Sequence, residues 1–224
     1  MNPSNSLIVF PCLNCFTWLV HGFTTRVEGI DVSAASRNKA LASLQKQHQT
    51  ILKSRGIGAG YLCFSEQVHG NKVATIHHFG VALGNSPVRG ADGLVTAKPN
   101  IALGVHVADC CAVFLVETKR RAIGLLHSGR KGTEANIVHE GVQQLKMVCD
   151  GRGHDIVAAL SPCIRSCCYD VDFVSEVERQ LREEGVGVIW RHPDCTGCHT
   201  GRYYSYRKEK GCTGRMLAFM MIRS

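Results

Sequence analysis

Two side chains capable of chemistry stand at the ends of a predicted β-hairpin in the middle of the chain. The apolar runs Cys111–Val116 and Ala122–Leu126 flank the charged segment Glu117–Arg121, a pattern that predicts two strands joined by a turn. Because a hairpin brings its outer ends together, we expect Cys110 and His127 to be neighbours. A thiol beside an imidazole forms half of a metal site or a nucleophile with its base, or the two side chains simply pack in the core.

A third candidate ligand, His69, lies at the centre of the turn Glu66–Asn71 between two predicted strands. With Cys110 and His127 it would give a set of two histidines and one cysteine with an open fourth position, as in catalytic zinc sites. The same set could hold copper. Spacing alone does not separate a metal site from a Cys110 nucleophile that uses His127 as its base.

The remaining cysteines of the twelve are expected to be mostly reduced, buried and apolar in behaviour. Two Cys-x-x-Cys pairs, Cys12/Cys15 and Cys195/Cys198, invite comparison with a zinc ribbon. The first pair falls in a predicted strand, where side chains three positions apart face opposite sides, so a structural zinc is not favoured. A third group is expected to pack rather than to bind metal: Cys163, Cys167 and Cys168.

Hydrophobic periodicity predicts a layered domain. Three helices are expected, over Ala34–Lys53, Ile137–Val148 and Phe173–Glu184. The first is expected to end at Gly56, Gly58 and Gly60, and the second to have Thr133 as its N-terminal cap. A loop is expected over residues 79–91. Besides the hairpin, strands are expected over Leu19–Thr24, Tyr61–Ser65, Lys72–His78, Ile101–Val107, Ile156–Leu160, Val186–Trp190 and Met216–Ile222. Without a regular βαβ alternation, this order favours an α+β or mixed α/β fold, with central sheets covered by helices in a single domain over residues 1–224.

The composition points to an anionic partner. The formal net charge is +8 with only 7% aromatic residues, and no nucleic-acid-binding module is recognisable, so a small phosphate-bearing molecule is favoured over nucleic acid. Arg130 and Lys131 follow His127 at a predicted helix start, where an anion is favoured. The apolar stretch Leu7–Val20 has no basic residue before it and contains Pro11, so we expect neither a signal peptide nor a membrane span, and a cytoplasmic protein.

Several short motifs resemble, together and in order, the YfiH family, also called the laccase-domain or polyphenol oxidase family. They run over nearly the whole chain: H-G-F-T-T-R (21–26), Q-V-H-G (67–70), A-D-G-L-V-T (91–96), A-D-C-C (108–111), L-H-S-G-R-K-G (126–132), S-P-C-I-R-S-C-C-Y-D-V (161–171), and C-T-G-C, Y-S-Y-R and T-G-R-M within 195–216. Members of this family are understood as zinc-dependent purine nucleoside phosphorylases.

The resemblance implies a mixed α/β layered fold and a catalytic zinc on His69, Cys110 and His127. It implies phosphorolysis of adenosine, inosine, guanosine and methylthioadenosine, with purine nucleoside and phosphate as partners. It also implies deamination of adenosine, in which a water made acidic by zinc attacks C6 of the purine. Phosphate needs cationic contacts.

On the same basis we assign phosphate binding to Arg26 and Lys131, of which Lys131 also counts as catalytic, and a polar substrate contact to Gln67. The chain is expected to act as a monomer or homodimer.

The chain departs from the family pattern in two places. Members usually carry Ala-Gly-Trp-Arg-Gly after the second zinc histidine, whereas this chain has Ser128–Gly132, in which Lys131 cannot make the bidentate contact of an arginine. The stretch between Arg26 and Asn38 is also shorter and lacks a Ser-Leu-Asn-Leu segment. Alternative functions are a copper-linked polyphenol oxidase, a thiol hydrolase built on Cys110 and His127, and a binding protein without turnover. None of the eleven histidines forms a His-x-His pair, which disfavours multicopper chemistry.

Overall fold

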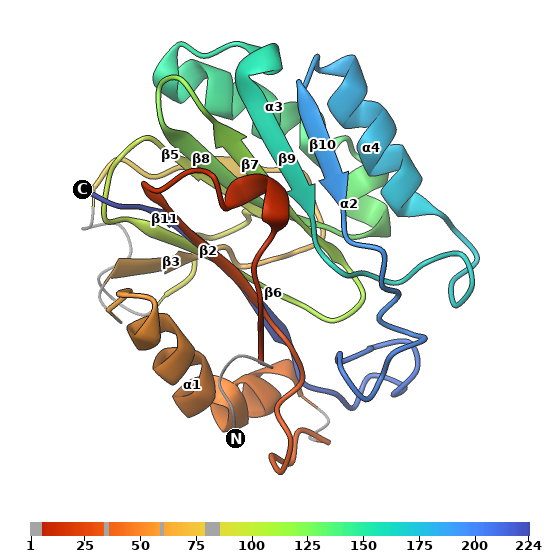
Figure 1. Cartoon of the computed structure of the whole chain (residues 1–224). Helices are drawn as coiled ribbons and strands as arrows, with labels where there is room; N and C mark the ends of the chain where they lie inside the picture. Colours follow the sequence, from red (N-terminus) through yellow and green to blue (C-terminus); the bar gives the residue numbers. More distant parts are fainter. Residues whose placement is uncertain (1–5, 34–35, 59–60, 79–85) are drawn as a thin grey trace.

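Two β-sheets stack against each other at the centre of the molecule (Figure 1). The computed structural model describes residues 6–33, 36–58, 61–78 and 86–224. One sheet has the order β1 (Leu7–Ile8), β2 (Leu19–Thr24), β11 (Met216–Ile222), β6 (Ala102–Val107) and β3 (Leu62–Phe64). The other has the order β10 (Val188–Arg191), β9 (Ile156–Leu160), β7 (Cys111–Glu117), β8 (Ala122–Ser128), β5 (Gly93–Thr96) and β4 (Val73–Thr75). Both sheets mix parallel and antiparallel pairs.

Alternation of side chains along the strands divides the core into layers. Even-numbered positions of β11 face the space between the sheets, and odd-numbered positions face the opposite side: Met216, Ala218, Met220 and Ile222 against Leu217, Phe219 and Met221. In β7 the inner positions are Ala112, Phe114 and Val116, and the outer ones are Cys111, Val113 and Leu115. Every residue of β7 is buried because both faces of this central strand are covered.

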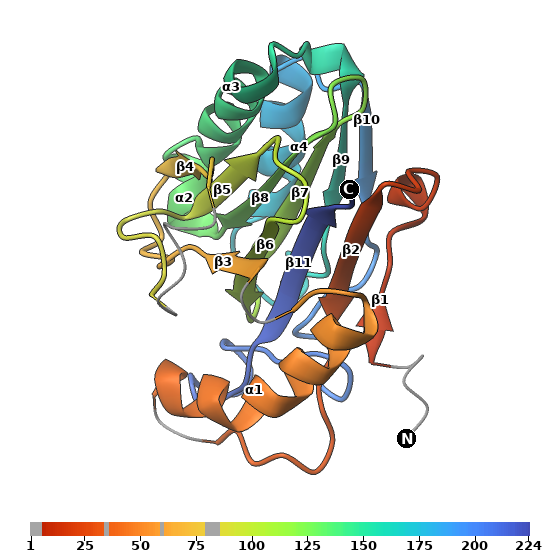
Figure 2. The same ribbon diagram turned by 90° about the vertical axis from the view of Figure 1, so that its left-hand side faces the viewer.

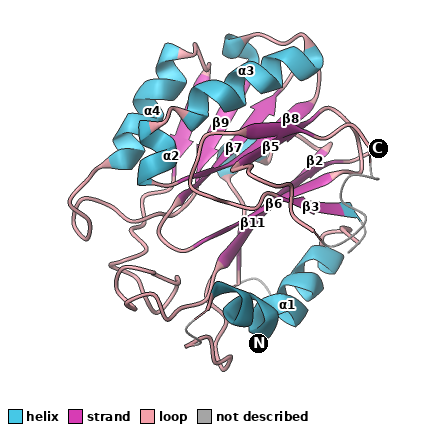
Figure 3. Ribbon diagram, turned by 180° about the vertical axis from the view of Figure 1, so that it is seen from behind, coloured by secondary structure: helices cyan, strands magenta, loops and turns pink. Residues whose placement is uncertain are grey.

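Helices cover the outer faces of both sheets. Figure 3 shows α3 (Ile137–Cys149) and α4 (Phe173–Glu183), with the short α2 (Arg130–Glu134), over the six-stranded sheet. Helix α1 (Arg37–Ser54) lies on the side of the five-stranded sheet (Figure 2) and begins where the Ser36 side chain accepts a hydrogen bond from the Lys39 amide. Two short 3₁₀ turns span Pro11–Leu13 and Gly153–Asp155. The mixed α/β layered fold is confirmed.

The predicted hairpin is confirmed, with His127 opposite Ala112 and Ser128 opposite Cys111 across β7 and β8. The strands predicted over Leu19–Thr24, Ile156–Leu160 and Met216–Ile222 have the predicted bounds. Of the other predictions, Ala34, Gly60 and residues 79–85 lie outside the described residues. None of the helices in the described ranges has the length and apolar character needed to cross a membrane.

Two local predictions are wrong. Thr133 does not cap the long helix, because it lies inside α2, where its hydroxyl donates to the Gly129 carbonyl oxygen. Asn136, in the left-handed conformation, separates α2 from α3. Cys12 and Cys15 do not lie in a strand, because Pro11 starts a 3₁₀ turn there.

Candidate active site

The mouth of the β7–β8 hairpin holds the three predicted ligands. Cys110 directly precedes β7 and His127 is the second-last residue of β8, so strand pairing places them side by side. His69 joins them from the turn before β4, with its ring edge-on to that of His127 at 4.8 Å between centroids. One donor atom from each of the three residues lies within 4.8 Å of the others. The sequence therefore predicted a set of side chains that the fold does bring together.

The turn that presents His69 has an unusual backbone. Gln67 and His69 both have positive φ, at 65° and 64°, a conformation that is unfavourable for residues with a side chain. The buried Asp92 carboxylate compensates for this by accepting hydrogen bonds from the amides of Val68, His69 and Gly70 at 3.1, 2.8 and 2.8 Å. Asp92 thus fixes the direction in which His69 points.

Asp92 also orients the second histidine. Its Oδ1 lies 2.9 Å from Nδ1 of His127, and a carboxylate accepts a proton there, so Nδ1 carries the hydrogen and Nε2 is left for the ligand side. A histidine that donates its other ring N–H to a carboxylate is the usual arrangement around a protein-bound zinc ion. The donor set and its support therefore fit a metal ion.

Electrostatics at this place favour a thiolate. Burial raises the pKa of the Cys110 thiol, but His127 and His69 outweigh burial and lower it to about 6. Burial lowers the pKa of His127, whereas Cys110 and Asp92 raise it to about 9. Since a thiolate is both the metal ligand and the nucleophile form of cysteine, the pair satisfies either role, and only His69 distinguishes a metal site from a Cys–His dyad.

Gly129 makes room for this arrangement. A Cβ atom at Gly129 would lie 2.7 Å from the Cys110 sulfur and 3.4 Å from the His69 ring. The next residues turn into α2, where the Ser128 and Thr133 hydroxyls hydrogen-bond at 2.8 Å. A glycine at position 129 is therefore required by the approach of the loop to the sulfur.

The three ligands open into a cavity of about 980 Å³, a size that suits a small-molecule substrate. Its walls carry two acidic side chains, Asp109 and Glu134, against six cationic ones: Arg37, Arg130, Lys131, Arg207, Lys210 and Arg215. The excess of positive charge favours an anionic ligand. Flat or apolar side chains contribute the rest of the wall, among them His106, Ile164, Tyr169, Phe173 and Tyr206.

His106 is a neutral part of this wall. It stacks on Phe64 at 4.7 Å and on His48 at 5.7 Å between ring centroids. Burial holds the pKa of His106 well below its usual value, and the neighbouring positive charges act in the same direction. His106 therefore presents an uncharged aromatic surface to the cavity.

Gln67 lines the cavity, but its amide group is engaged with protein atoms. Its Nε2 donates to the His106 carbonyl oxygen at 2.6 Å, and its Oε1 accepts from the His106 amide at 3.0 Å and from Arg37 at 2.8 Å. The side chain joins the His69 turn to β6 and fixes Arg37 at the cavity wall.

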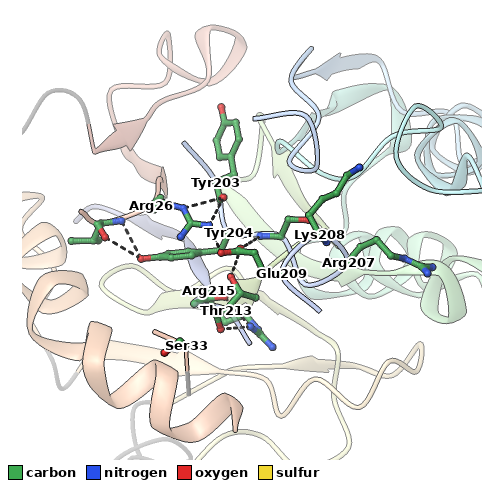
Figure 4. Close-up of polar contacts among 12 residues, drawn as sticks. Arg26, Ser33, Tyr203, Tyr204, Arg207, Lys208, Glu209, Thr213 and Arg215 are labelled. Atoms are coloured by element: carbon green, nitrogen blue, oxygen red, sulfur yellow. Dashed lines mark hydrogen bonds and ion pairs between the residues drawn. The ribbon is translucent and has the colours of Figure 1, made fainter. Parts of the chain in front are cut away.

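Arg26 lies away from the ligands, beside a smaller hollow formed with Lys208 and Glu209. Figure 4 shows its guanidinium between the Tyr203 carbonyl oxygen and Glu209, to which it is paired at 2.7 Å. It also stacks on Tyr204. Arg26 is thus not brought to the cavity that holds His69, Cys110 and His127.

Lys131 is exposed at the cavity wall, as the sequence placed it, next to Arg130, whose guanidinium pairs with Glu134 at 2.8 Å. Sequence reasoning missed Asp92 and Arg37. An acidic residue between a small residue and a glycine at a strand start was the available signal for Asp92. Nothing in the sequence brings Arg37 and Arg215 together, since they come from opposite ends of the chain.

A second group of potential ligands contradicts one prediction. Cys167, expected to pack rather than to bind metal, is exposed, whereas Cys168 packs against the core as expected. Both lie beside Cys195 and Cys198, and all four sulfur atoms lie within 4.8 Å of one another. Cys163 is fully buried, as expected. The error arose because the prediction paired Cys195 and Cys198 with the distant Cys12 and Cys15.

Fold and site together define a layered α/β protein with a two-histidine, one-cysteine centre at a hairpin mouth. The chain belongs to the family described as multi-copper polyphenol oxidoreductase laccase, which matches residues 20–178 and 170–223. This agrees with the resemblance to the YfiH family.

Relatives and solved structures extend the likeness over nearly the whole chain. A protein of Geobacillus stearothermophilus named purine nucleoside phosphorylase YlmD is 29% identical over 92% of this chain and 90% of its own length. A purine nucleoside phosphorylase of Deinococcus radiodurans is 29% identical over 88% of this chain and 87% of its own. The crystal structure of Bacillus licheniformis YfiH superimposes with a TM-score of 0.87 at 21% identity, covering 100% of both chains. The crystal structure of the Geobacillus YlmD gives a TM-score of 0.85 at 22% identity, covering 100% of this chain and 98% of that one.

Proposed function

We propose that this protein is a purine nucleoside phosphorylase that uses zinc held by His69, Cys110 and His127. The proposal rests mainly on one observation: these three side chains lie in the wall of a large cavity that is also lined by six cationic side chains. The names of the relatives support the same activity. A site with three protein ligands and an open side suits a catalytic metal rather than a structural one.

Phosphorolysis breaks the bond between C1′ of the ribose and N9 of the purine and forms a bond between C1′ and a phosphate oxygen. The electron pair of the broken bond stays on the purine, and the proton of hydrogen phosphate ends on the released base. The cationic wall supplies what the attacking dianion needs, because Lys131, Arg37 and Arg215 face the cavity that the ligands open into. Lys131, exposed and flexible, is the cation we assign to phosphate.

The nucleoside is held by the flat part of the wall. His106 and Tyr169 offer aromatic surfaces on which a purine can stack. Asp92 keeps the hydrogen on Nδ1 of His127 and so keeps the metal-binding nitrogen free. A bound zinc ion would supply a Lewis acid that polarises an oxygen of the reactants. Adenosine, inosine, guanosine and methylthioadenosine are the nucleosides we propose, with deamination of adenosine as a second activity of the same site.

Zinc is preferred to copper on the chemistry of the donors. Within the described residues, the two candidate metal groups contain only two histidines between them, and a multicopper centre is built mainly from imidazoles. A phenol oxidase would instead require copper in the purified protein and oxygen uptake with a phenol.

The test is product analysis with purified protein, inosine and phosphate. We expect free hypoxanthine and ribose 1-phosphate in equal amounts, no product when phosphate is left out, and loss of activity on zinc removal. Base release without phosphate would indicate a hydrolase, and activity that survives chelators but not thiol alkylation would indicate the Cys110–His127 dyad; either result refutes the proposal. Adenosine incubated without phosphate tests deamination separately through the release of ammonia.

A further inference from the structure

Four cysteines that are not ligands of the cavity site lie together in a second cluster. Cys167 and Cys168 belong to the loop between β9 and α4, whereas Cys195 and Cys198 belong to the loop between β10 and β11. All four sulfur atoms lie within 4.8 Å of one another. The sulfur of Cys198 lies 3.3 Å from that of Cys167 and 3.5 Å from that of Cys168.

These separations fit four sulfurs around one metal ion. A disulfide would bring two sulfurs to about 2.05 Å, and the described chain keeps all its cysteines free. Sulfurs bound at about 2.3 Å to one tetrahedral zinc ion lie about 3.8 Å apart, which is close to the observed distances. A cluster with several iron atoms would need more space, because its cysteines bind different irons.

The backbone around Cys195 is arranged as for a thiolate. The Arg165 amide donates to the Cys195 sulfur at 3.3 Å. A neutral thiol is a weak acceptor, so an amide donor directed at this sulfur favours negative charge on it.

Gly197 permits the close approach of the two loops. A Cβ atom at Gly197 would lie 2.8 Å from Cβ and 3.1 Å from the sulfur of Cys168. The loops are joined nearby through a β-bridge between Cys163 and Cys195. The backbone is thus shaped to bring Cys168 over the Cys195–Cys198 turn.

We infer that Cys167, Cys168, Cys195 and Cys198 bind a zinc ion in a second site, structural and separate from the cavity. Four thiolates from the protein close the coordination shell, as in structural zinc sites. The ion joins the loop after β9 to the loop before β11.

This link supports one wall of the cavity. Thr196, which follows Cys195, donates from its hydroxyl to Asp109 at 2.6 Å, and Asp109 immediately precedes Cys110. Tyr169, which follows Cys168, lines the cavity. The second zinc would therefore hold two segments that border the cavity site. Neither segment contributes a ligand to that site.

Metal counting tests the inference. Protein purified with a thiol reductant is expected to contain two zinc ions per chain by mass spectrometry. Cys198→Ser and Cys110→Ala are each expected to contain one, because each removes a ligand of a different site. Cys212→Ser, an exposed cysteine outside the cluster, is the control and keeps two. A wild-type chain with one zinc that Cys110→Ala removes and Cys198→Ser retains overturns the inference.

A second measurement does not depend on the folding of Cys198→Ser. Cobalt(II) added to the metal-free Cys110→Ala variant is expected to give strong thiolate-to-cobalt charge-transfer absorption, with the intensity of four thiolates. Absence of that absorption overturns the inference. So does a disulfide among the four cysteines in metal-free protein isolated under the same reducing conditions, found by alkylation and peptide mass analysis.

Discussion

Replacement of Gly129 by alanine tests whether the cavity site depends on the close approach of the 129 loop to Cys110. The added Cβ atom would lie 2.7 Å from the Cys110 sulfur, about 0.7 Å short of the 3.4 Å at which ordinary contact begins. Ligand distances in metal sites are held within about 0.2 Å. The sulfur must therefore move several times further than a metal site tolerates.

Two consequences of different size are expected. Overpacking costs about 1–3 kcal/mol, and the reduced freedom of alanine in the unfolded chain offsets about 0.4–1 kcal/mol because φ at position 129 is −96° and suits any residue. The free energy of unfolding of the metal-free protein should therefore fall by less than about 3 kcal/mol. Zinc affinity at the cavity site should fall on the order of 10–100-fold, as for changes in groups that support metal ligands.

Urea unfolding of metal-free protein measures the first effect, and zinc titration against a competing chelator measures the second. Gly201→Ala is the matched control, because a Cβ atom there would meet nothing within 4 Å. Full zinc affinity and unchanged phosphorolysis in Gly129→Ala would refute the reasoning, since the sulfur would then have moved without loss of the site.

Three further changes probe the groups around the site and the acid stability. Asp92→Asn leaves two of the four donors at this buried position facing an NH₂ group, so we expect a loss of about 2–6 kcal/mol in unfolding free energy, measured in urea, and weaker zinc binding. Lys131→Ala should raise the KM for phosphate about tenfold with a smaller effect on the KM for inosine, and Lys131→Arg should restore it. Burial lowers the pKa of both His21 and His48 to about 4. Below about pH 6.5 the unfolded chain binds a proton at each of these histidines, whereas the folded chain does not. Each histidine should therefore lower the free energy of unfolding by about 3 kcal/mol as the pH falls from 6.5 to 4, measured by unfolding at each pH.

Each of these changes has a control. Asp31→Asn, on an exposed aspartate, should leave zinc binding and stability unchanged. Lys119→Ala removes an exposed lysine at the opposite end of the hairpin, and an equal rise in KM for phosphate there would contradict the role of Lys131. His48→Leu should flatten the fall in stability toward acid, whereas the exposed His154→Ala should not; identical pH dependence in both variants would count against burial as the cause.

Patterns local in sequence predicted much of the fold. Apolar runs with a charged segment between them defined the β7–β8 hairpin, and the pairing of His127 with Ala112 followed from it. The same periodicity predicted α4, which starts at Phe173 because the Asp172 side chain accepts from the Ser175 amide. These elements depend on neighbours within a few residues, so the sequence displays their cause directly.

Contacts between distant segments were not visible in the same way. Cys167 and Cys198 are 31 positions apart and meet only because the two loops run side by side. Arg26 stands in a motif of the family resemblance, yet its charge is paired with Glu209, 183 positions along the chain. Asp92 also stands in a motif of the family resemblance, and its role depends on four donors from two other segments. Such groups are assembled by tertiary packing, which spacing does not encode.

Two buried carboxylates explain how a strained backbone is held at the cavity. Gln67, His69 and Asp109 all have positive φ, at 65°, 64° and 84°, and each such residue costs on the order of 1–3 kcal/mol unless its surroundings impose the conformation. Asp92 imposes this conformation on the turn that contains Gln67 and His69, because its carboxylate accepts hydrogen bonds from three backbone amides of that turn. Asp109 holds its own turn by accepting from the Thr196 hydroxyl at 2.6 Å and the Arg207 amide at 2.7 Å. Because Thr196 follows a cysteine of the second cluster, the strained backbone at Asp109, next to Cys110, is supported from the segment that the inferred structural zinc would fix.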